Sequence, residues 1–327
     1  MRILITGAAG FVGCHMLAPL IEREHEVFSL ERHRSWREPL GASTAGRPVF
    51  CDLRDHFAVR QVVRDVQPEA VIHLAAISPV SYSYDHPNEI LEANLIGTVN
   101  LAEACLREVP QFRQFLFASS SETYGKGPVP KTEETPQNPN SPYSVSKLAA
   151  EKYVLYLRDA YRLPATVLRL FNTYGRKDNA DFVVERTIVQ MLRGHTVRLG
   201  APSPVRDLLY VDDHVNAYLS CLGNEKAIGG IFNFSTGRGV SVSELVGLLA
   251  SLTGFVGEVV WDTIPRRPLD IDGMIGDSSQ AEKILGWRPR VSLEEGLLLC
   301  IGHWKRRLDS FLASPSAAEP AAMVRGV

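Results

Sequence analysis

Tyr143 and Lys147 are two residues whose types and spacing could do chemistry. They lie four apart in PNSPYSVSKLAAEKY, a pattern that predicts a helix capped by Ser141 with Pro142 in its first turn. Residues at i and i+4 share one helix face, so both side chains can point at one site. A free tyrosine has a pKa of about 10, and a nearby ammonium group favours its phenolate. The pair is a candidate general base with a supporting cation. An exposed tyrosine beside a surface lysine would have the same spacing.

A second polar group, the stretch SSSETYG, follows the apolar run 114–118. In a strand, residues two apart share a face, so Ser120 and Glu122 are expected to face the same cleft. A carboxylate held within reach of a reacting carbon suits the role of a base. The alternative is a structural carboxylate paired with Lys126 or Lys131.

The glycines of ILITGAAGFVG mark a third candidate site. Gly7, Gly10 and Gly13 come directly after an apolar run and open a helical pattern. Such a turn lets the backbone approach a pyrophosphate, and the helix N-terminus supplies free N–H groups and partial positive charge. The context of a strand before and a helix after it predicts a dinucleotide site.

The next predicted strand ends near Glu31, which Arg32 and Arg34 follow closely. An acidic residue at this position bonds the ribose hydroxyls of NAD, whereas an arginine can hold the 2′-phosphate of NADP. We expect NAD as the cofactor, with NADP possible.

Two arginines stand out in the second half of the chain: Arg206 in VRDLLYVDD and Arg267 in RRPLDID. Guanidinium groups hold a diphosphate well because they are planar and carry several donors. For Arg206 the alternative is a structural ion pair with Asp207 or Asp212.

Short apolar runs alternate with helical patterns and must position these residues. The strand candidates are residues 3–6, 26–30, 49–52, 70–74, 115–118, 166–170 and 231–234. The helix candidates are residues 11–24, 58–65, 89–108, 143–161, 182–193 and 243–253. The alternation predicts an α/β fold with a Rossmann-type, doubly wound parallel sheet.

The pattern changes after about residue 172, where Gly, Pro and short helices become more frequent. We therefore expect a Rossmann-type NAD(P)-binding domain from residues 1–171 and 207–236. Residues 172–206 and 237–311 would form a smaller, mixed α/β substrate domain. The Ala-, Pro- and Ser-rich residues 312–327 would be a loose tail.

The composition of the 327 residues excludes several classes of function. Hydrophobic residues make up 45%, charged residues 22%, and the net charge is −2, so a nucleic-acid partner is not expected. No apolar run approaches the roughly 20 residues of a membrane span. The five cysteines are scattered without CxxC spacing, so we expect neither disulfides nor a metal site, and a cytoplasmic location.

Motifs in order along residues 1–310 resemble the extended short-chain dehydrogenase/reductase family, that is, the nucleotide-sugar epimerases and dehydratases. They are TGAAGFVG, Asp52-Leu53, HLAA at 73–76, SSSETYG, PYSVSK, LRLFNTYG at 168–175, VRDLLYVDD at 205–213, RRPLDID at 266–272 and LGW at 285–287. The resemblance implies an NAD-dependent enzyme that acts through a 4-keto sugar, and a homodimer built on long helices.

The resemblance also assigns roles to residues. Tyr143 would take the proton of a sugar hydroxyl, Lys147 would bond the nicotinamide ribose, and Ser120 would help to polarise carbon 4. The other residues expected to line the cofactor are Phe11, Val12, Asp52, Leu53, Leu74, Ala75 and Ala76. The residues expected to bind a nucleotide-diphosphate sugar are Ser81, Asn172, Arg206 and Arg267.

The triplet Ser120-Ser121-Glu122 resembles that of 4,6-dehydratases, in which the carboxylate acts on carbon 5. The segments RRPLDIDGMIGD and RLGAPSPVRD resemble GDP-mannose dehydratases and GDP-sugar reductases, so a GDP-linked sugar is preferred and a UDP-linked one stays open. The first expectation is a GDP-mannose-like 4,6-dehydratase, a lyase. The alternatives are a 4-epimerase, an isomerase, then a 4-keto-sugar reductase or a UDP-glucuronate decarboxylase, and remotely a non-catalytic dinucleotide-binding protein.

Overall fold

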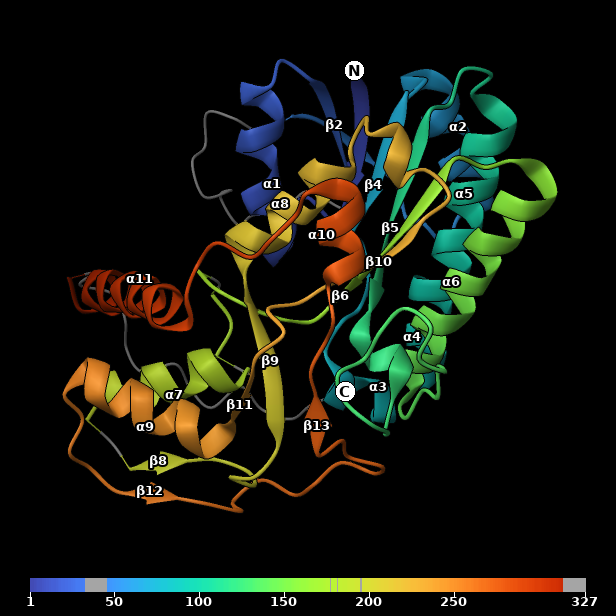
Figure 1. Cartoon of the computed structure of the whole chain (residues 1–327). Helices are drawn as coiled ribbons and strands as arrows, with labels where there is room; N and C mark the ends of the chain where they lie inside the picture. Colours follow the sequence, from blue (N-terminus) through green and yellow to red (C-terminus); the bar gives the residue numbers. More distant parts are fainter. Residues whose placement is uncertain (33–45, 177, 181, 195, 314–327) are drawn as a thin grey trace.

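A seven-stranded parallel sheet forms the centre of the computed structural model, which describes residues 1–32, 46–176, 178–180, 182–194 and 196–313 (Figure 1). The strand order is β10-β6-β5-β4-β1-β2-β3. The strands are β1 (Arg2–Thr6), β2 (Glu26–Glu31), β3 (Arg47–Phe50), β4 (Ala70–His73), β5 (Gln114–Ser120), β6 (Ala165–Leu170) and β10 (Ile231–Phe234). The predicted doubly wound α/β fold is confirmed. The strands are nearly continuous apolar runs because helices cover both faces.

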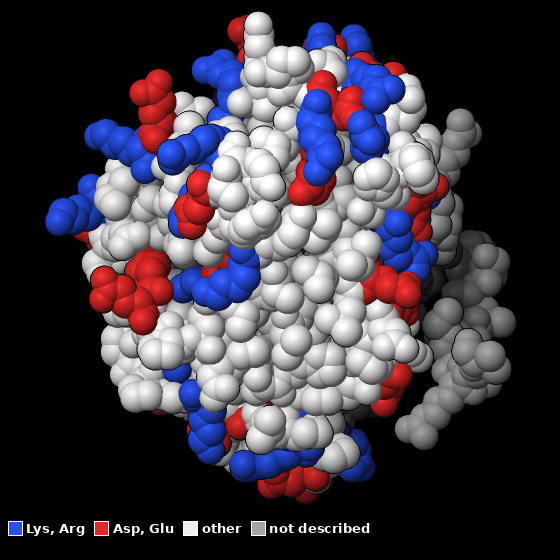
Figure 2. Space-filling view, turned by 90° about the vertical axis from the view of Figure 1, so that its right-hand side faces the viewer, with Lys and Arg blue, Asp and Glu red and all other residues white. Residues whose placement is uncertain are grey.

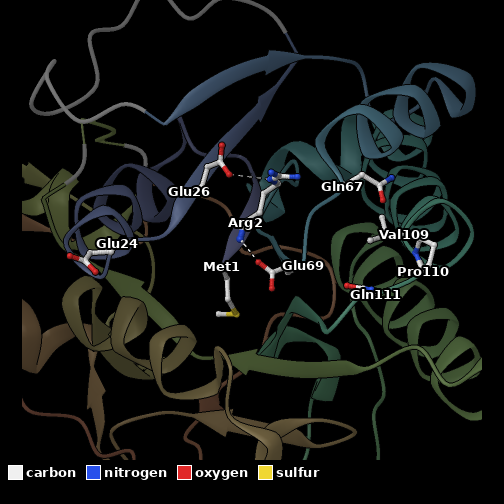
Figure 3. A pocket seen from close by; sticks show the side chains of 9 residues that line it. All are labelled: Met1, Arg2, Glu24, Glu26, Gln67, Glu69, Val109, Pro110 and Gln111. Carbon is white, nitrogen blue, oxygen red and sulfur yellow. Dashed lines mark hydrogen bonds and ion pairs between the residues drawn. The ribbon is translucent and has the colours of Figure 1, made fainter.

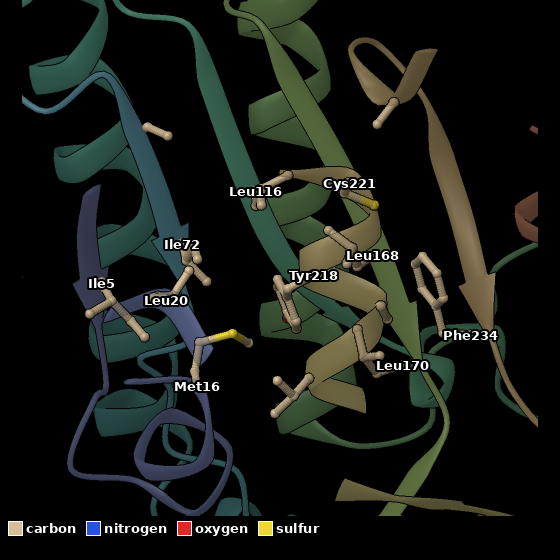
Figure 4. Close-up of a cluster of buried hydrophobic side chains, with 14 of the residues drawn as sticks. Ile5, Met16, Leu20, Ile72, Leu116, Leu168, Leu170, Tyr218, Cys221 and Phe234 are labelled. Atoms are coloured by element: carbon tan, nitrogen blue, oxygen red, sulfur yellow. The ribbon is translucent and has the colours of Figure 1, made fainter. Parts of the chain in front are cut away.

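Helices cover both faces of this sheet (Figure 1). On one side lie α1 (Phe11–Glu22), α8 (Val211–Cys221) and α10 (Ser279–Leu285), and on the other lie α2 (His56–Val66), α5 (Gly97–Glu108) and α6 (Pro142–Tyr161). Figure 4 shows the first of these cores, in which Met16 and Leu20 of α1 and Tyr218 of α8 lie over Ile72 and Leu168 of the strands. These contacts fix the start of α1 over the carboxyl ends of the strands.

The helix predicted for residues 89–108 begins earlier and contains an irregular turn. It follows α3 (Val80–Asp85) and consists of α4 (Pro87–Leu91), a π-helix η1 (Glu92–Ile96) and α5. The π turn carries Asn94, which is buried, accepts the N–H of Ile77 at 2.8 Å and donates to Ser146 Oγ at 3.0 Å. Asn94 thereby ties the loop after β4 to α6, and π turns of this kind are frequent at functional sites.

A smaller sheet follows the first six strands. It contains β7 (Asn172–Tyr174), β9 (Val205–Tyr210), β11 (Gly239–Ser241) and β13 (Gly273–Met274), with β9 paired to the other three. The prediction placed residues 207–210 with the large sheet. They lie in the small sheet because Leu208 and Tyr210 pack into a second apolar core. The chain rejoins the large sheet through α8 and β10.

Helices α7 (Val183–Leu192), α9 (Val242–Thr253) and α11 (Leu293–Ala313) enclose this second core, with the short strands β8 (Val197–Arg198) and β12 (Val259–Val260) beside them. The 3₁₀ turn η3 (Glu225–Ala227) joins α8 to β10. Residues 312 and 313 of the predicted tail belong to α11, and residues 314–327 lie outside the described part. None of the helices within the described ranges has the length and apolar character needed to cross a membrane.

Candidate active site

The carboxyl ends of β1, β4 and β5 meet at one edge of the large sheet, where doubly wound folds bind their ligands. Gly7 follows β1, Leu74 follows β4, and Ser120 is the last residue of β5. Helix α6 begins at the same edge and brings Tyr143 and Lys147 to it. The sequence motifs therefore meet in space because the strands that precede them are neighbours.

The glycine turn is built for a close approach by a ligand. Gly7 has φ +73°, and a Cβ on it would lie 2.9 Å from the backbone nitrogen of Ala75. A Cβ on Gly13 would lie 2.2 Å from the carbonyl oxygen of Gly7. Gly10 is the N-cap of α1 and gives the helix no side-chain cap, so the N–H groups of its first turn remain available to a phosphate. This cradle fits the pyrophosphate of a dinucleotide.

The expected ribose and adenine end contains Glu31, the last residue of β2, and the exposed Arg32 beside it. Asp52 lies two residues beyond the end of β3, not in a strand as expected, and its carboxylate accepts from Arg54 Nη2 at 2.7 Å. This bond with Arg54 lowers the pKa of Asp52. Leu53 packs against Gly97 of α5. Arg34 lies outside the described residues.

Tyr143 and Lys147 lie buried on one face of α6, so the surface alternative for the pair is wrong. The helix starts as expected, with Ser141 as N-cap in a capping box and Pro142 in the first turn. Lys147 Nζ donates to the carbonyl oxygen of Ala118 at 2.8 Å, which directs the ammonium group toward the end of β5. Burial lowers the pKa of Lys147 to about 8.

Burial raises the pKa of Tyr143 to about 12, and a hydrogen bond with the side chain of Ser120 acts in the opposite direction. Burial thus favours the neutral phenol over the phenolate. Positive charge near the ring would favour the phenolate. Ser120 and Tyr143 are thus hydrogen-bonded to each other, and the catalytic roles of these residues and of Lys147 stay a prediction.

Glu122 faces this group, but through a different backbone from the one expected. Strand β5 ends at Ser120, two residues beyond the predicted strand 115–118, and residues Ser121–Tyr124 form a 3₁₀ turn, η2. The strand spacing assumed for Ser120 and Glu122 is therefore wrong. Ser120 Oγ accepts the N–H of Glu122 at 3.2 Å and caps this turn. The side chains of Glu122 and Ser121 are both buried. The Oε2 atom of Glu122 has no hydrogen-bond partner among the described residues.

The charge of Glu122 affects the pKa values of two residues of the site, Tyr143 and Arg206. It adds to the burial that raises the pKa of Tyr143. It also opposes the burial that lowers the pKa of Arg206. Lys126, one partner of Glu122 in the structural alternative, pairs instead with Asp272 at 3.5 Å. A buried carboxylate oxygen without a partner is costly, which indicates that it faces a ligand site.

The two predicted diphosphate-binding arginines converge on one carboxylate. The Nη2 atoms of Arg206 and Arg267 lie 3.8 Å and 3.0 Å from Asp270 Oδ1. Arg206 is the more buried of the two, on β9, and burial lowers its pKa. An anion placed beside these guanidinium groups would meet two converging donors.

The alternative for Arg206, an ion pair with Asp207 or Asp212, does not form. Asp207 Oδ2 accepts the backbone N–H groups of Gly237 at 2.9 Å and Gly276 at 3.2 Å. Asp212 pairs with Arg176 at 2.9 Å. The guanidinium group of Arg206 instead contacts Asp270 and donates from Nη1 to the carbonyl oxygen of Val205 at 3.0 Å.

The remaining predicted substrate residues differ in their positions. Asn172, at the start of β7, has a buried Oδ1 that no described residue bonds, as expected of an amide that faces a ligand. Ser81 is exposed on α3, whereas Ser83 of the same helix is buried and donates to the carbonyl oxygen of Val80 at 2.6 Å. The structure does not bring Ser81 into the network of contacts around Ser120.

Sequence reasoning missed Tyr84 and Asn140. The hydroxyl of Tyr84 lies 2.9 Å from the carbonyl oxygen of Pro268, and Asn140 Nδ2 donates to that of Leu269 at 2.9 Å. Both contacts hold the segment that carries Arg267 against the first part of the chain. No local pattern signals them, because their partners are more than 120 residues away.

A hollow of about 620 Å³ lies elsewhere, at the amino ends of the strands (Figure 3). Its lining residues are Met1, Arg2, Glu24, Glu26, Gln67, Glu69, Val109, Pro110 and Gln111. Two of its charges are paired, because Arg2 Nε donates to Glu26 at 3.1 Å. It lies at the opposite edge from the candidate active site.

Comparisons with known proteins agree with this geometry. Residues 4–298 match the family model described as GDP-mannose 4,6 dehydratase. The crystal structure of a UDP-glucose 4-epimerase from Thermotoga maritima with UDP-glucose superposes with a TM-score of 0.87 at 34% identity, covering 94% of this chain and all of that one. The UDP-glucose 4-epimerase of Thermus thermophilus in complex with NAD gives 0.85 at 32% identity, with coverage of 93% and 99%.

One further relative has a different activity. The GDP-6-deoxy-D-mannose reductase of Pseudomonas aeruginosa is 30% identical, over 94% of this chain and 98% of its own length. The similarities span nearly the whole chain and include both sheets. The chain belongs to the extended short-chain dehydrogenase/reductase family, among the nucleotide-sugar epimerases and dehydratases.

Proposed function

We propose that the protein is an NAD-dependent nucleotide-sugar 4-epimerase. The observation that carries this proposal is the buried group of Ser120, Tyr143 and Lys147 beside an uncapped glycine turn. The similarity to UDP-glucose 4-epimerases favours the epimerase over the 4,6-dehydratase that the sequence motifs suggested first.

The proposed cofactor is NAD, which would supply reversible hydride transfer when bound. Gly7, Gly10 and Gly13 would hold its pyrophosphate at the start of α1, and Glu31 would bond the ribose hydroxyls. The exposed Arg32 keeps NADP as the competitor. Titration with both dinucleotides tests the assignment, and NADP binding at least about tenfold tighter would overturn it.

The side chains of this chain would handle the proton. Tyr143 would accept the proton of the carbon-4 hydroxyl once positive charge nearby has lowered the pKa of the phenol. Lys147 supplies an ammonium group in the buried site and would bond the nicotinamide ribose. Ser120, hydrogen-bonded to Tyr143, would orient the same hydroxyl. An epimerase needs no further acid or base. The keto sugar would rotate in the site, so that the hydride returns to the opposite face of carbon 4.

The proposed substrate is a nucleotide-diphosphate sugar. Arg206 and Arg267 would bind the diphosphate in place of Asp270, and the free amide oxygen of Asn172 would accept from the ligand. We favour a UDP-linked sugar, because the related solved structures are UDP-glucose 4-epimerases; a GDP-linked sugar is the competitor. The residues of the first sheet would thus bind the cofactor and those of the second part the sugar nucleotide.

A 4,6-dehydratase is the second candidate, and the unpartnered Oε2 of Glu122 favours it. A carboxylate at this place could remove the proton of carbon 5 after oxidation at carbon 4. In an epimerase the same oxygen would only accept a hydrogen bond from the sugar.

Product analysis separates these reactions. The protein is incubated with UDP-glucose, UDP-glucuronate, dTDP-glucose and GDP-mannose, and the products are identified by mass spectrometry and NMR. A new isomer of unchanged mass supports the epimerase, loss of water the dehydratase, and loss of carbon dioxide a decarboxylase. Full turnover by the Glu122→Gln variant would rule out the dehydratase reaction. If the protein converts none of the four nucleotide sugars, the proposal is contradicted.

We also propose a homodimer in the cytoplasm. Ile96 of η1 and Val145 and Tyr156 of α6 are exposed apolar residues on one side of the molecule. Figure 2 shows a broad area without charges at the centre of this side. A second copy would cover this apolar strip, which contains Ile96, Val145 and Tyr156.

The proposed location in the cytoplasm is supported by the five free cysteines, which fit a reducing compartment.

A further inference from the structure

The side chains of the SSSETYG segment fall into two sets. Ser120 and Glu122 face the candidate active site, as described above. The other set, Ser119, Thr123 and Tyr124, is buried and turns to polar partners beneath the site.

An ion pair between helix α6 and strand β6 lies at the centre of these partners. Arg169 Nη2 donates to Glu151 Oε1 at 2.6 Å, and the two residues are 3% and 0% exposed. Glu151 also accepts from Ser119 Oγ at 2.5 Å and from Gln137 Nε2 at 3.1 Å. Every oxygen of this buried carboxylate is therefore bonded, as a buried charge requires.

Tyr124 connects this ion pair to the end of the η2 turn. Its hydroxyl accepts from Arg169 Nη1 at 2.9 Å and donates to Asn233 Oδ1 at 2.7 Å. Its ring lies 5.0 Å from the centre of the guanidinium group. Strands β6 and β10 thus hold the Tyr124 hydroxyl. Because Tyr124 lies two positions after Glu122, these bonds fix the end of the turn that carries Glu122.

Thr123 fixes the other side of the turn. Its Oγ1 donates to the carbonyl oxygen of Ser120 at 2.8 Å and accepts from Gln137 Nε2 at 3.0 Å. Since Gln137 also bonds Glu151, the turn is held to the ion pair at Thr123 and Tyr124, and Ser119 holds the end of β5 to the same carboxylate. Glu122 lies between Ser119 and Thr123 in the chain.

Stability alone gives little reason for such a pair, because well-packed apolar residues often replace a buried ion pair without loss of stability. Catalysis gives a stronger one, since a displacement of about 1 Å can lower a rate by about 100-fold. We propose that Tyr124, Glu151 and Arg169 form a positioning network that holds Ser120 and Glu122 in place relative to Tyr143. The inference rests on the proposed function, in which Ser120 and Tyr143 act on the carbon-4 hydroxyl.

The test compares Tyr124→Phe with the matched variant Tyr210→Phe. Tyr210 is also buried, and its hydroxyl also accepts from an arginine, Arg176 Nη1, at 2.7 Å. It lies in the second apolar core and contacts none of Ser120, Glu122 or Tyr143 in the described interactions. Both variants lose one buried phenol hydroxyl, so a general loss of stability affects them alike.

We expect Tyr124→Phe to lower kcat at least about tenfold and to change the KM of the nucleotide sugar less than about twofold. Hydrogen–deuterium exchange of the peptide containing residues 119–125 should be faster than in the wild type. Tyr210→Phe should keep kcat within about twofold and leave exchange in this peptide unchanged.

Unchanged exchange of residues 119–125 in Tyr124→Phe would overturn the proposal, as would a kcat no lower than that of Tyr210→Phe. If Tyr124→Phe does not fold, Gln137→Met removes the bridge between Thr123 and Glu151 and leaves the ion pair intact. Unchanged exchange in that variant would also overturn the proposal. A wild type that converts no nucleotide sugar contradicts the proposed function instead, and the exchange comparison still decides on the network.

Discussion

At the scale of single residues, Lys147 is a buried cation that donates to one carbonyl oxygen, that of Ala118. Its place in the core is explained by the proposed chemistry and not by stability, since burial lowers its pKa from 10.5 to about 8. Such a residue should cost the folded state free energy at neutral pH. This is the usual relation between a functional site and stability.

We expect Lys147→Met to be inactive and about 1–2 kcal/mol more stable than the wild type near neutral pH. The lowered pKa of Lys147 corresponds to about 3 kcal/mol of destabilisation of the folded wild type. In the variant the carbonyl oxygen of Ala118 loses its donor, which offsets about 1 kcal/mol of the gain. Between pH 8 and 10.5 the folded state releases the Lys147 proton while the unfolded state keeps it. Wild-type stability therefore rises with pH relative to the variant. Urea unfolding across this range measures the difference, and a constant difference would contradict the assignment.

Arg267 and Arg266 give a second test at this scale. Arg267 contacts Asp270 in the site, whereas its neighbour Arg266 is exposed. Arg267→Ala should raise the KM of the nucleotide sugar about tenfold or more and leave NAD binding within about twofold, because it removes a charged contact to the diphosphate. Arg266→Ala should change neither. Equal effects of Arg267→Ala on both ligands would show that this arginine does not serve the sugar nucleotide.

At the scale of elements, the glycine turn and helix α1 depend on one another. A side chain on Gly13 would meet the carbonyl oxygen of Gly7, so helix and turn could no longer pack together. We expect Gly13→Ala to lose bound dinucleotide and to lower the Tm by several degrees. Gly247→Ala in α9 is the control; a Cβ there meets nothing within 4 Å. It should stabilise the protein by about 0.5–1 kcal/mol. Retention of NAD by Gly13→Ala would argue against a pyrophosphate at this turn.

The elements that sequence patterns predicted are those whose signals are local. The strands of the large sheet are continuous apolar runs, and α6 has its cap residues Ser141 and Pro142 next to its first turn. The 3₁₀ turn after β5 had no such signal, because side chains distant in sequence, such as Gln137, hold it. For the same reason the contacts of Tyr84 and the position of β9 in the second sheet could not be predicted.

At the scale of the whole molecule, the site lies where the two parts of the chain meet. Contacts of Tyr84 and Asn140 with Pro268 and Leu269 join the second part to the first. The outer face of η1 and α6, by contrast, carries the exposed apolar side chains of Ile96, Val145 and Tyr156 (Figure 2). A second copy of the chain would complete the molecule there.

We expect the wild type to sediment as a dimer and Val145→Glu to dimerise at least about tenfold more weakly, because the variant places a charge in the apolar strip. Val256→Glu is the control. It makes the same substitution at a residue that is 99% exposed and lies outside the strip. Sedimentation velocity at several concentrations distinguishes the species. A monomeric wild type, or equal association of both variants, would contradict the proposed dimer.

The central claim is that the enzyme oxidises carbon 4 of a nucleotide sugar and returns the same hydride. The most direct measurement is incubation with UDP-glucose that carries deuterium on carbon 4, followed by NMR of the product. We expect the 4-epimer with the deuterium still on carbon 4. Deuterium found on carbon 6 with loss of water would contradict the epimerase and support the dehydratase. A product that has lost its deuterium to the solvent would contradict internal hydride return altogether.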